Sequence, residues 1–188
     1  MNLNDSYMPQ DGLGPRGFVI LSNPKTGQIY VKKHNLVLNE GRKILMAKLL
    51  NGFDDEDESS EKTNNYSSYN FVSIGLSDNA EEPSYGDVYN SSDIKKELSF
   101  RNNNGELSVN KTFKYRDDDP NKSPYILFSI TAPIDLELWD TSNFHTINSL
   151  GIIMSDGTNK KLFSRITFDP IPITNELTEF KLDYYIYF

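Results

Sequence analysis

Histidine is the side chain that enzymes use most often as a general base, and the chain holds only His34 and His145. A serine triad needs a histidine beside a nucleophile and a carboxylate, and neither histidine lies in a motif of that kind. The sequence has no G-x-S-x-G segment. It also has no cysteine, which excludes a thiol nucleophile, a zinc ribbon and an iron–sulfur site. We therefore expect both imidazoles to be exposed or locally bonded, and the chain not to be an enzyme.

Two runs of carboxylates, Asp54–Glu58 and Asp117–Asp119, are the segments in which a cation site could form. Neither contains the glycine that an EF-hand calcium loop needs at its sixth position, so we expect solvated acidic loops, with a weak cation site as the alternative. Paired acids also serve glycosidases, which hold two carboxyl groups about 5–9 Å apart around a cleft. With 27 acidic residues in the chain, pairs arise by chance. The sequence therefore implies no cofactor and no metal.

Binding to phosphate or nucleic acid is not indicated by the basic residues. The segment Gly157–Lys161 lacks the second glycine of a phosphate-binding G-x-x-x-x-G-K-[ST] loop. Lysines occur in isolated pairs, whereas a nucleic-acid surface needs a basic stripe. The net charge is −8 and the pI is near 4.8, so non-specific attraction to DNA or to an anionic membrane is disfavoured. We expect no specific nucleic-acid partner and no membrane partner.

The hydropathy pattern predicts a chain that neither crosses a membrane nor enters a secretory pathway. No apolar run approaches the about 18 residues that span a bilayer, and Tyr125–Ile130 is among the longest. The first residues lack the basic start and apolar stretch of a signal peptide. We therefore expect synthesis in the cytoplasm. The length of 188 residues suits one sizeable domain.

One short helix is predicted near residues 40–51. Asn39 is a favourable N-cap, and Glu40 places negative charge in the first turn. Asn51-Gly52 supplies a C-terminal stop. A broad apolar face comes from Ile44, Leu45, Ala47 and Leu50.

The remaining pattern is typical of β structure. Short apolar or alternating runs recur at regular spacing, separated by turns rich in glycine, asparagine and proline. We predict a mainly β domain, an antiparallel β-sandwich that is Ig-like or jelly-roll-like, or a closely related barrel. Residues 1–16 are expected to form an extended arm, and residues 17–188 the single domain, with a long acidic loop at 53–68. The strand-like runs are Phe18–Leu21, Gln28–Lys33, Tyr69–Leu76, Ile94–Phe100, Leu107–Tyr115, Ile126–Ile130, Ile147–Met154, Lys161–Phe168 and Lys181–Phe188.

The last strand is apolar or aromatic on both faces. Leu182, Tyr184, Ile186 and Phe188 alternate toward the core, which leaves Tyr185 and Tyr187 on the other side. A strand with one wet face alternates more cleanly. Either another element of the same domain covers these two tyrosines, or a partner subunit does, since tyrosine is favoured in interfaces.

Several segments together resemble a group of tailed-bacteriophage virion proteins. Those proteins typically carry N-x-x-x-N-x-G-R before a short helix, then an apolar strand ending in glycine, then I-x-E-x-G-L and L-F-A-R-x-x-F-x-P-I. The corresponding segments here are Asn35–Arg42, Tyr69–Gly75, Ile147–Ile152 and Leu162–Ile171, and the terminal aromatic strand matches as well. Order and spacing agree over residues 18–188, and Ser149 stands where an acid is usual.

This resemblance implies a structural part of a phage particle in the neck, tail, baseplate or fibre attachment, assembled as a ring, without catalysis or cofactor. The implied partners are further copies of the chain and other virion proteins such as portal, neck or tail components. The candidate interface residues are Arg16, Arg42, Arg165, Tyr185 and Tyr187. We expect Arg42 and Arg165 each to fix a loop through a carboxylate or carbonyl, with a surface salt bridge as the alternative.

An alternative function belongs to a different class. Exposed tyrosines and Trp139 could stack on sugars, which would make the chain a carbohydrate-binding or carbohydrate-cleaving module of a tail appendage. Binding of a host polysaccharide, or its absence, separates the two hypotheses.

Overall fold

A computed structural model describes residues 15–50, 66–101, 110–115, 124–133, 145–174 and 179–187. These residues form nine strands and one helix, and they contain no helix long and apolar enough to cross a membrane. The elements in chain order are β1 (Arg16–Ser22), β2 (Ile29–Val37), α1 (Asn39–Leu50), β3 (Asn70–Ser77), β4 (Lys96–Ser99), β5 (Asn110–Tyr115), β6 (Pro124–Pro133), β7 (Thr146–Ser155), β8 (Lys160–Pro172) and β9 (Glu179–Tyr187).

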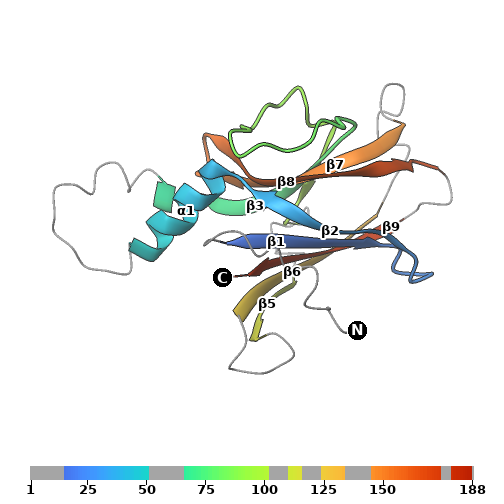
Figure 1. The fold of residues 1–188 in the computed structure, drawn as a ribbon, viewed down its shortest axis with the longest axis horizontal. Helices are drawn as coiled ribbons and strands as arrows, with labels where there is room; N and C mark the ends of the chain where they lie inside the picture. Colours follow the sequence, from blue (N-terminus) through green and yellow to red (C-terminus); the bar gives the residue numbers. More distant parts are fainter. Residues whose placement is uncertain are drawn as a thin grey trace.

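The nine strands join one antiparallel sheet in the order β4-β3-β7-β8-β2-β1-β9-β6-β5. The prediction of a mainly β, antiparallel fold with one short helix is therefore confirmed. β2 joins the two halves of the sheet (Figure 1). Its first part pairs with β1, and its last residues, Leu36 and Val37, pair with Arg165 and Ser164 of β8. The strands on either side of β2 thus belong to one continuous sheet.

The two halves of this sheet share one apolar core. Phe71 of β3 packs on Phe128 of β6 with ring centroids 4.9 Å apart, and on Phe163 of β8 at 5.0 Å. Strand alternation supplies the inward side chains of both halves. The buried residues of this core include Val19, Leu21, Val31, Ile74, Leu76, Phe128, Ile130, Leu150, Ile152, Met154, Phe163, Ile166, Leu182, Tyr184 and Ile186.

The helix α1 (Asn39–Leu50) lies close to the predicted residues 40–51 and projects from one end of the sheet (Figure 1). Its first intrahelical bond runs from the Arg42 N–H to the Leu38 carbonyl, so Leu38, and not Asn39 as predicted, occupies the N-cap position. Ile44 and Ala47 are buried on its inner side. Gly41 lets the first turn approach β8, because a Cβ at this position would lie 2.3 Å from the carbonyl oxygen of Phe163. Gly41, which belongs to the motif Asn35–Arg42, is therefore also the residue that allows α1 to pack closely on β8.

Several predictions concern residues outside the described ranges. They are the arm up to residue 14, the acidic loop at 53–65, the cluster Asp117–Asp119 and Trp139. Arg16, placed at the end of the arm by the sequence, is instead the first residue of β1, where it lies in register with Tyr187. The strand therefore begins before Phe18, where the sequence pattern placed its start.

Candidate functional site

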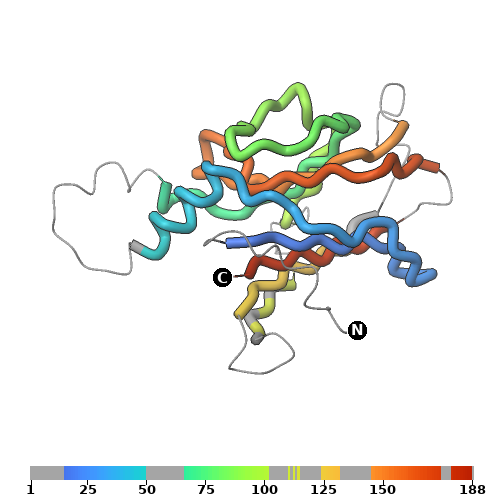
Figure 2. Tube along the Cα trace, viewed as in Figure 1, coloured from blue at the N-terminus to red at the C-terminus, as the bar shows by residue number. Residues whose placement is uncertain are grey.

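The connection between β3 and β4, residues 78–95, lies along one face of the sheet and has no regular secondary structure (green in Figure 2). We call it the β3–β4 loop. Short-range hydrogen bonds determine its shape. The Asp87 carboxylate accepts a hydrogen bond from the Ser84 backbone N–H at 3.1 Å. The Asn90 side-chain oxygen accepts one from the Ser92 backbone N–H at 3.1 Å. Turns of this kind are formed by the side chains of Asp, Asn and Ser.

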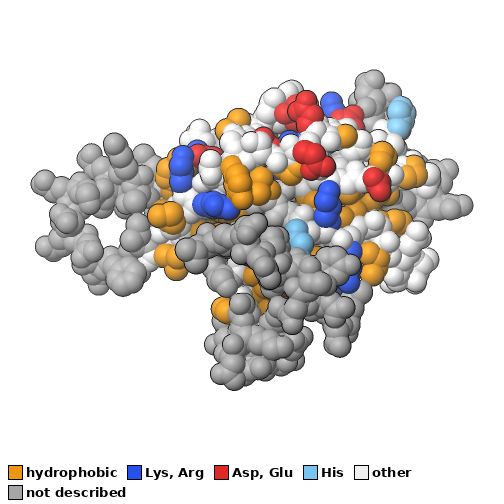
Figure 3. Space-filling view, viewed as in Figure 1, with side chains coloured by type: hydrophobic (Ala, Val, Ile, Leu, Met, Phe, Trp, Pro, Cys, Tyr) orange, Lys and Arg blue, Asp and Glu red, His pale blue; other side chains and the backbone are white. Residues whose placement is uncertain are grey.

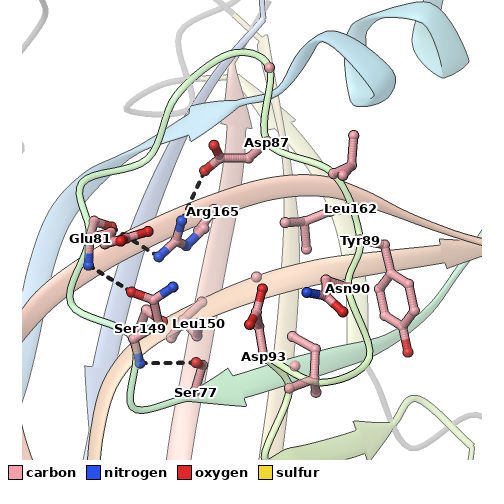
Figure 4. A pocket seen from close by; sticks show the side chains of 16 residues that line it. Ser77, Glu81, Asp87, Tyr89, Asn90, Asp93, Ser149, Leu150, Leu162 and Arg165 are labelled. Carbon is pink, nitrogen blue, oxygen red and sulfur yellow. Dashed lines mark hydrogen bonds and ion pairs between the residues drawn. The ribbon is translucent and has the colours of Figure 1, made fainter.

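Arg165 of β8 binds this loop from the sheet side. Its Nη1 donates to Asp87 Oδ2 at 2.9 Å, and its Nη2 donates to the Glu81 carbonyl oxygen at 2.9 Å (Figure 4). The Arg165 side chain is only 13% exposed. A planar guanidinium can make two such contacts at once, so Arg165 binds the carboxylate and the carbonyl that its position led us to expect.

Arg42 of α1 contacts the same loop. Its guanidinium lies over the ring of Tyr85, 4.6 Å from the centroid, and its Nε donates to the Val37 carbonyl at 3.2 Å. The Asn39 backbone N–H donates to the Tyr85 carbonyl at 3.0 Å. Two of the predicted site residues, far apart in the sequence, therefore position one loop.

Two glycines let apolar side chains anchor the loop on the sheet. Gly75 of β3 and Gly151 of β7 face each other in register. A Cβ at Gly75 would lie 2.8 Å from Ile94 Cδ1, and one at Gly151 would lie 2.7 Å from Leu162 Cδ1. Ile94 packs there against a small cluster that includes Leu162. The missing side chains thus leave room for the C-terminal part of the loop.

A cavity of about 300 Å³ with a mixed polar and apolar lining lies between the loop and strands β3, β7 and β8. Figure 4 shows Asp93, Asn90 and Tyr89 beside it on the loop. Ser149 of β7 is buried in its lining. Carboxylate, amide and hydroxyl groups of this kind can hydrogen-bond a polar ligand. Among the described residues, no group of three His, Asp or Glu side chains could hold a metal ion.

A charged network ties α1 to β8 beside the loop. Glu40 accepts a hydrogen bond from Lys161 Nζ at 2.5 Å and another from Lys43 Nζ at 2.9 Å. Burial acts to raise the pKa of Glu40, but the hydrogen bonds and charges of the two lysines outweigh it and hold the pKa below its ordinary value. Glu40 is therefore ionised at neutral pH and connects α1 to β8 through its ion pair with Lys161.

The outward side of α1 was missed by the sequence reasoning. Arg42, Met46 and Leu49 share one side of the helix because they are spaced i, i+4 and i+7. Met46 is 61% and Leu49 66% exposed. The sequence of α1 did indicate this, because its apolar residues are spread around more of the helix than a single buried face would occupy. Beside α1, the loop residues Tyr85 and Val88 are exposed as well.

The other predicted residues lie on β1 and β9. Tyr185 and Tyr187 stack on each other on the face of β9 that points away from the core, with centroids 6.2 Å apart. Phe18 of β1 and Tyr125 of β6 pack beside them, so neighbouring strands supply contacts to both tyrosines. Burial raises the pKa of Tyr185. The five predicted residues therefore form two groups, with Arg42 and Arg165 at the loop and Arg16 near the two tyrosines.

Neither histidine lines the cavity below the loop. His34 of β2 contacts Phe18 edge-on, with ring centroids 5.1 Å apart. His145 is exposed just before β7, and its carbonyl accepts from the Ile173 N–H at 2.9 Å. His145 is thus exposed as predicted, whereas the His34 ring is partly buried and its Nε2 has no hydrogen-bond partner among the described residues.

Comparison with protein-family models, with curated proteins and with solved structures finds no match to this chain.

Proposed function

We propose that the chain is a structural protein of a tailed phage particle, a ring-forming component of the neck, tail or baseplate. In this role it joins further copies of itself and neighbouring virion proteins. The proposal starts from the sequence resemblance to such proteins. What supports it in the structure is the way in which the residues of the resembling motifs contact one another.

The motif residues are used for positioning. Asn35 donates a side-chain hydrogen bond to the Tyr184 hydroxyl, which links β2 to the terminal aromatic strand. Gly41 lies against Phe163, which joins the first motif to the L-F-x-R motif of β8. Arg165 of that motif binds Asp87 and Glu81 in the loop. The single observation that carries the proposal is this convergence, because it fixes α1 and the loop to a rigid sheet.

A rigid sheet that holds one helix and one long loop in place suits assembly. Rigid elements lose little conformational entropy when a neighbour binds them, so a surface fixed in advance binds more tightly. In this role the ion pair between Arg165 and Asp87 shapes a surface and carries out no proton transfer. The proposal accordingly includes no reaction, no cofactor, and neither nucleic acid nor membrane as partner.

Immunoelectron microscopy of purified particles tests this proposal. Antibodies raised against the purified chain should label one site in the neck-to-tail region or at the baseplate. Digestion and mass spectrometry of the same particles should recover peptides of the chain in several copies per particle. Particles that carry neither the label nor the peptides would overturn the proposal.

A second candidate, carbohydrate binding on a tail appendage, is favoured by the cavity below the loop. Asp93, Asn90 and the ring of Tyr89 lie together at its edge, and such groups bind sugar hydroxyls and sugar faces. If this function is correct, host polysaccharide binds the purified chain in calorimetry and Asp93→Ala weakens the binding at least tenfold. Lys32→Ala, an exposed change on β2, is the matched control. No heat of binding with the unaltered chain removes this candidate.

A further inference from the structure

The surface formed by α1 and the β3–β4 loop divides into a basic half and an acidic half. The helix carries Arg42, Lys43 and Lys48 against one acid, Glu40, although the chain as a whole has 27 acidic and 19 basic residues. The β3–β4 loop, residues 78–95, contains five acidic side chains and one basic one, Lys95, and of the five acids Asp87 is paired with Arg165. Figure 3 shows Lys and Arg side chains over α1 and Asp and Glu side chains over the loop.

Each half also exposes large apolar side chains. Met46 and Leu49 on α1 are 61% and 66% exposed, and Tyr85 and Val88 on the loop are 48% and 67% exposed. These are four of the five large apolar residues that are exposed in the described part of the chain. Apolar residues gathered in this way, with a charged rim, are typical of protein–protein contacts.

The two halves lie side by side on one face. Tyr85 of the loop contacts α1 through the Asn39 N–H and through the Arg42 guanidinium. From Arg42, the helix continues through Met46 to Leu49 on the same side. The surface is therefore continuous from the acidic loop to the basic, apolar side of the helix. We call it the α1–loop surface.

A partner for this surface must itself carry both signs of charge. An acidic partner would favour α1 but meet like charges on the loop, and a basic partner would meet the reverse conflict. A second copy of this chain carries a basic helix and an acidic loop side by side. A two-fold axis between the halves would place α1 of each copy on the loop of the other, as an isologous contact requires.

We infer that the α1–loop surface pairs two copies of this chain through a two-fold contact, with each basic helix on its partner's acidic loop. The exposed apolar residues supply burial at the centre, and the charges set the orientation. This inference goes beyond the proposed phage role and does not rest on it, since the contact pairs subunits whether or not further contacts close a ring.

Charge-swap variants test the contact. One variant, Lys43→Glu with Met46→Glu, makes the helix acidic; the other, Glu81→Lys with Glu82→Lys and Asp93→Lys, reverses the net charge of the loop to positive. Size-exclusion chromatography with light scattering measures the mass over a range of protein concentrations. The unaltered chain should reach twice its 21.5 kDa monomer mass, and each variant alone should stay at the monomer mass because like charges then face each other.

Mixing the two variants makes the test specific. An acidic helix then meets a basic loop, and a basic helix meets an acidic loop, so an equimolar mixture should recover the dimer mass. Ile29→Glu is the matched control, since Ile29 is an exposed apolar residue at the end of β2 away from α1, and this variant should keep the dimer. Circular dichroism checks that every variant is folded.

Three results would overturn the inference: an unaltered chain that is monomeric at every concentration, variants that keep the dimer mass, or a mixture that stays monomeric. None of these results bears on whether particles contain the chain. Particle labelling decides the proposed function, and the mixing experiment decides the contact.

Discussion

Arg165 is the residue whose removal should most affect the β3–β4 loop. It is nearly buried and binds both the Asp87 carboxylate and the Glu81 carbonyl. Hydrogen bonds to charged groups contribute more than neutral ones, and loss of one partner leaves the other desolvated without compensation. We predict that Arg165→Ala lowers the free energy of unfolding by about 2 kcal/mol, as measured by urea denaturation.

The matched control for this change is Lys32→Ala, which removes an exposed cation from β2 and should leave the free energy of unfolding nearly unchanged. Limited proteolysis adds a local readout, because the loop should be cut faster in Arg165→Ala than in the control. Equal cutting of the two variants would contradict the role given to Arg165.

Glu40 should make part of the stability depend on pH. Its pKa is held below the ordinary value of 4.5, so the unfolded chain binds this proton more readily than the folded chain does. The stabilisation from Glu40 is therefore fully present above pH 4.5 and is lost as pH falls through the lowered folded-state pKa. We predict that Glu40→Gln destabilises the protein near neutral pH and that the difference from the unaltered chain narrows below pH 4.5. Urea unfolding measured from neutral to acidic pH checks this, and a difference that does not change with pH would contradict it.

At the scale of elements, Gly41 fixes how closely α1 lies on β8. A glycine in a helix ordinarily costs about 1 kcal/mol relative to alanine, so Gly→Ala there should stabilise if space allows. Here the added Cβ would lie 2.3 Å from a backbone oxygen, and overpacking of this kind costs about 1–3 kcal/mol. We predict that Gly41→Ala lowers the free energy of unfolding in urea.

Gly86→Ala is the matched control for this steric effect. It lies in the β3–β4 loop, and a Cβ there would meet no atom within 4 Å. This variant should be neutral or slightly stabilising. A stable Gly41→Ala protein would show that α1 is free to shift on the sheet.

The sequence predicts those features of the elements that are set by residues adjacent in the chain, and it does not predict contacts between residues that are far apart. The place of α1 follows to within one residue from the local pattern around Asn39 and Glu40, and the second face of β9 follows from alternation within that strand. The connection of Arg165 to Asp87 spans 78 residues, and no sequence pattern indicates it. The outward Met46 and Leu49 escaped prediction because a helix in which apolar residues surround the axis does not itself say which face is buried.

At the scale of the molecule, Phe71 links the two halves of the sheet. Its ring packs on Phe128 from one half and on Phe163 from the other. Truncation of a fully buried phenylalanine costs about 3–5 kcal/mol, and because Phe71 is only partly buried against this core we expect a smaller cost of about 2 kcal/mol. We predict that Phe71→Ala lowers stability by this amount while unfolding stays a single transition, because both halves share one core.

Coincidence of far-ultraviolet and near-ultraviolet circular dichroism during urea unfolding checks this prediction. Ile29→Ala, which truncates an exposed residue of β2, is the control and should change stability little. Two separate transitions in the Phe71→Ala protein would show that the halves of the sheet fold independently.

The fold class was accessible from the sequence because strand periodicity and turn residues repeat along the whole chain. The joining of all strands into one sheet was not, since it depends on the two residue pairs by which the end of β2 meets β8. Such long-range pairing is set by packing of the complete core, which no local pattern encodes.

The most direct measurement is a cryo-electron microscopy reconstruction of the purified particle. We expect several copies of the sheet, with α1 and the β3–β4 loop resolved, arranged around the particle axis in the neck, tail or baseplate. A particle whose density holds no copy of this sheet would contradict the account.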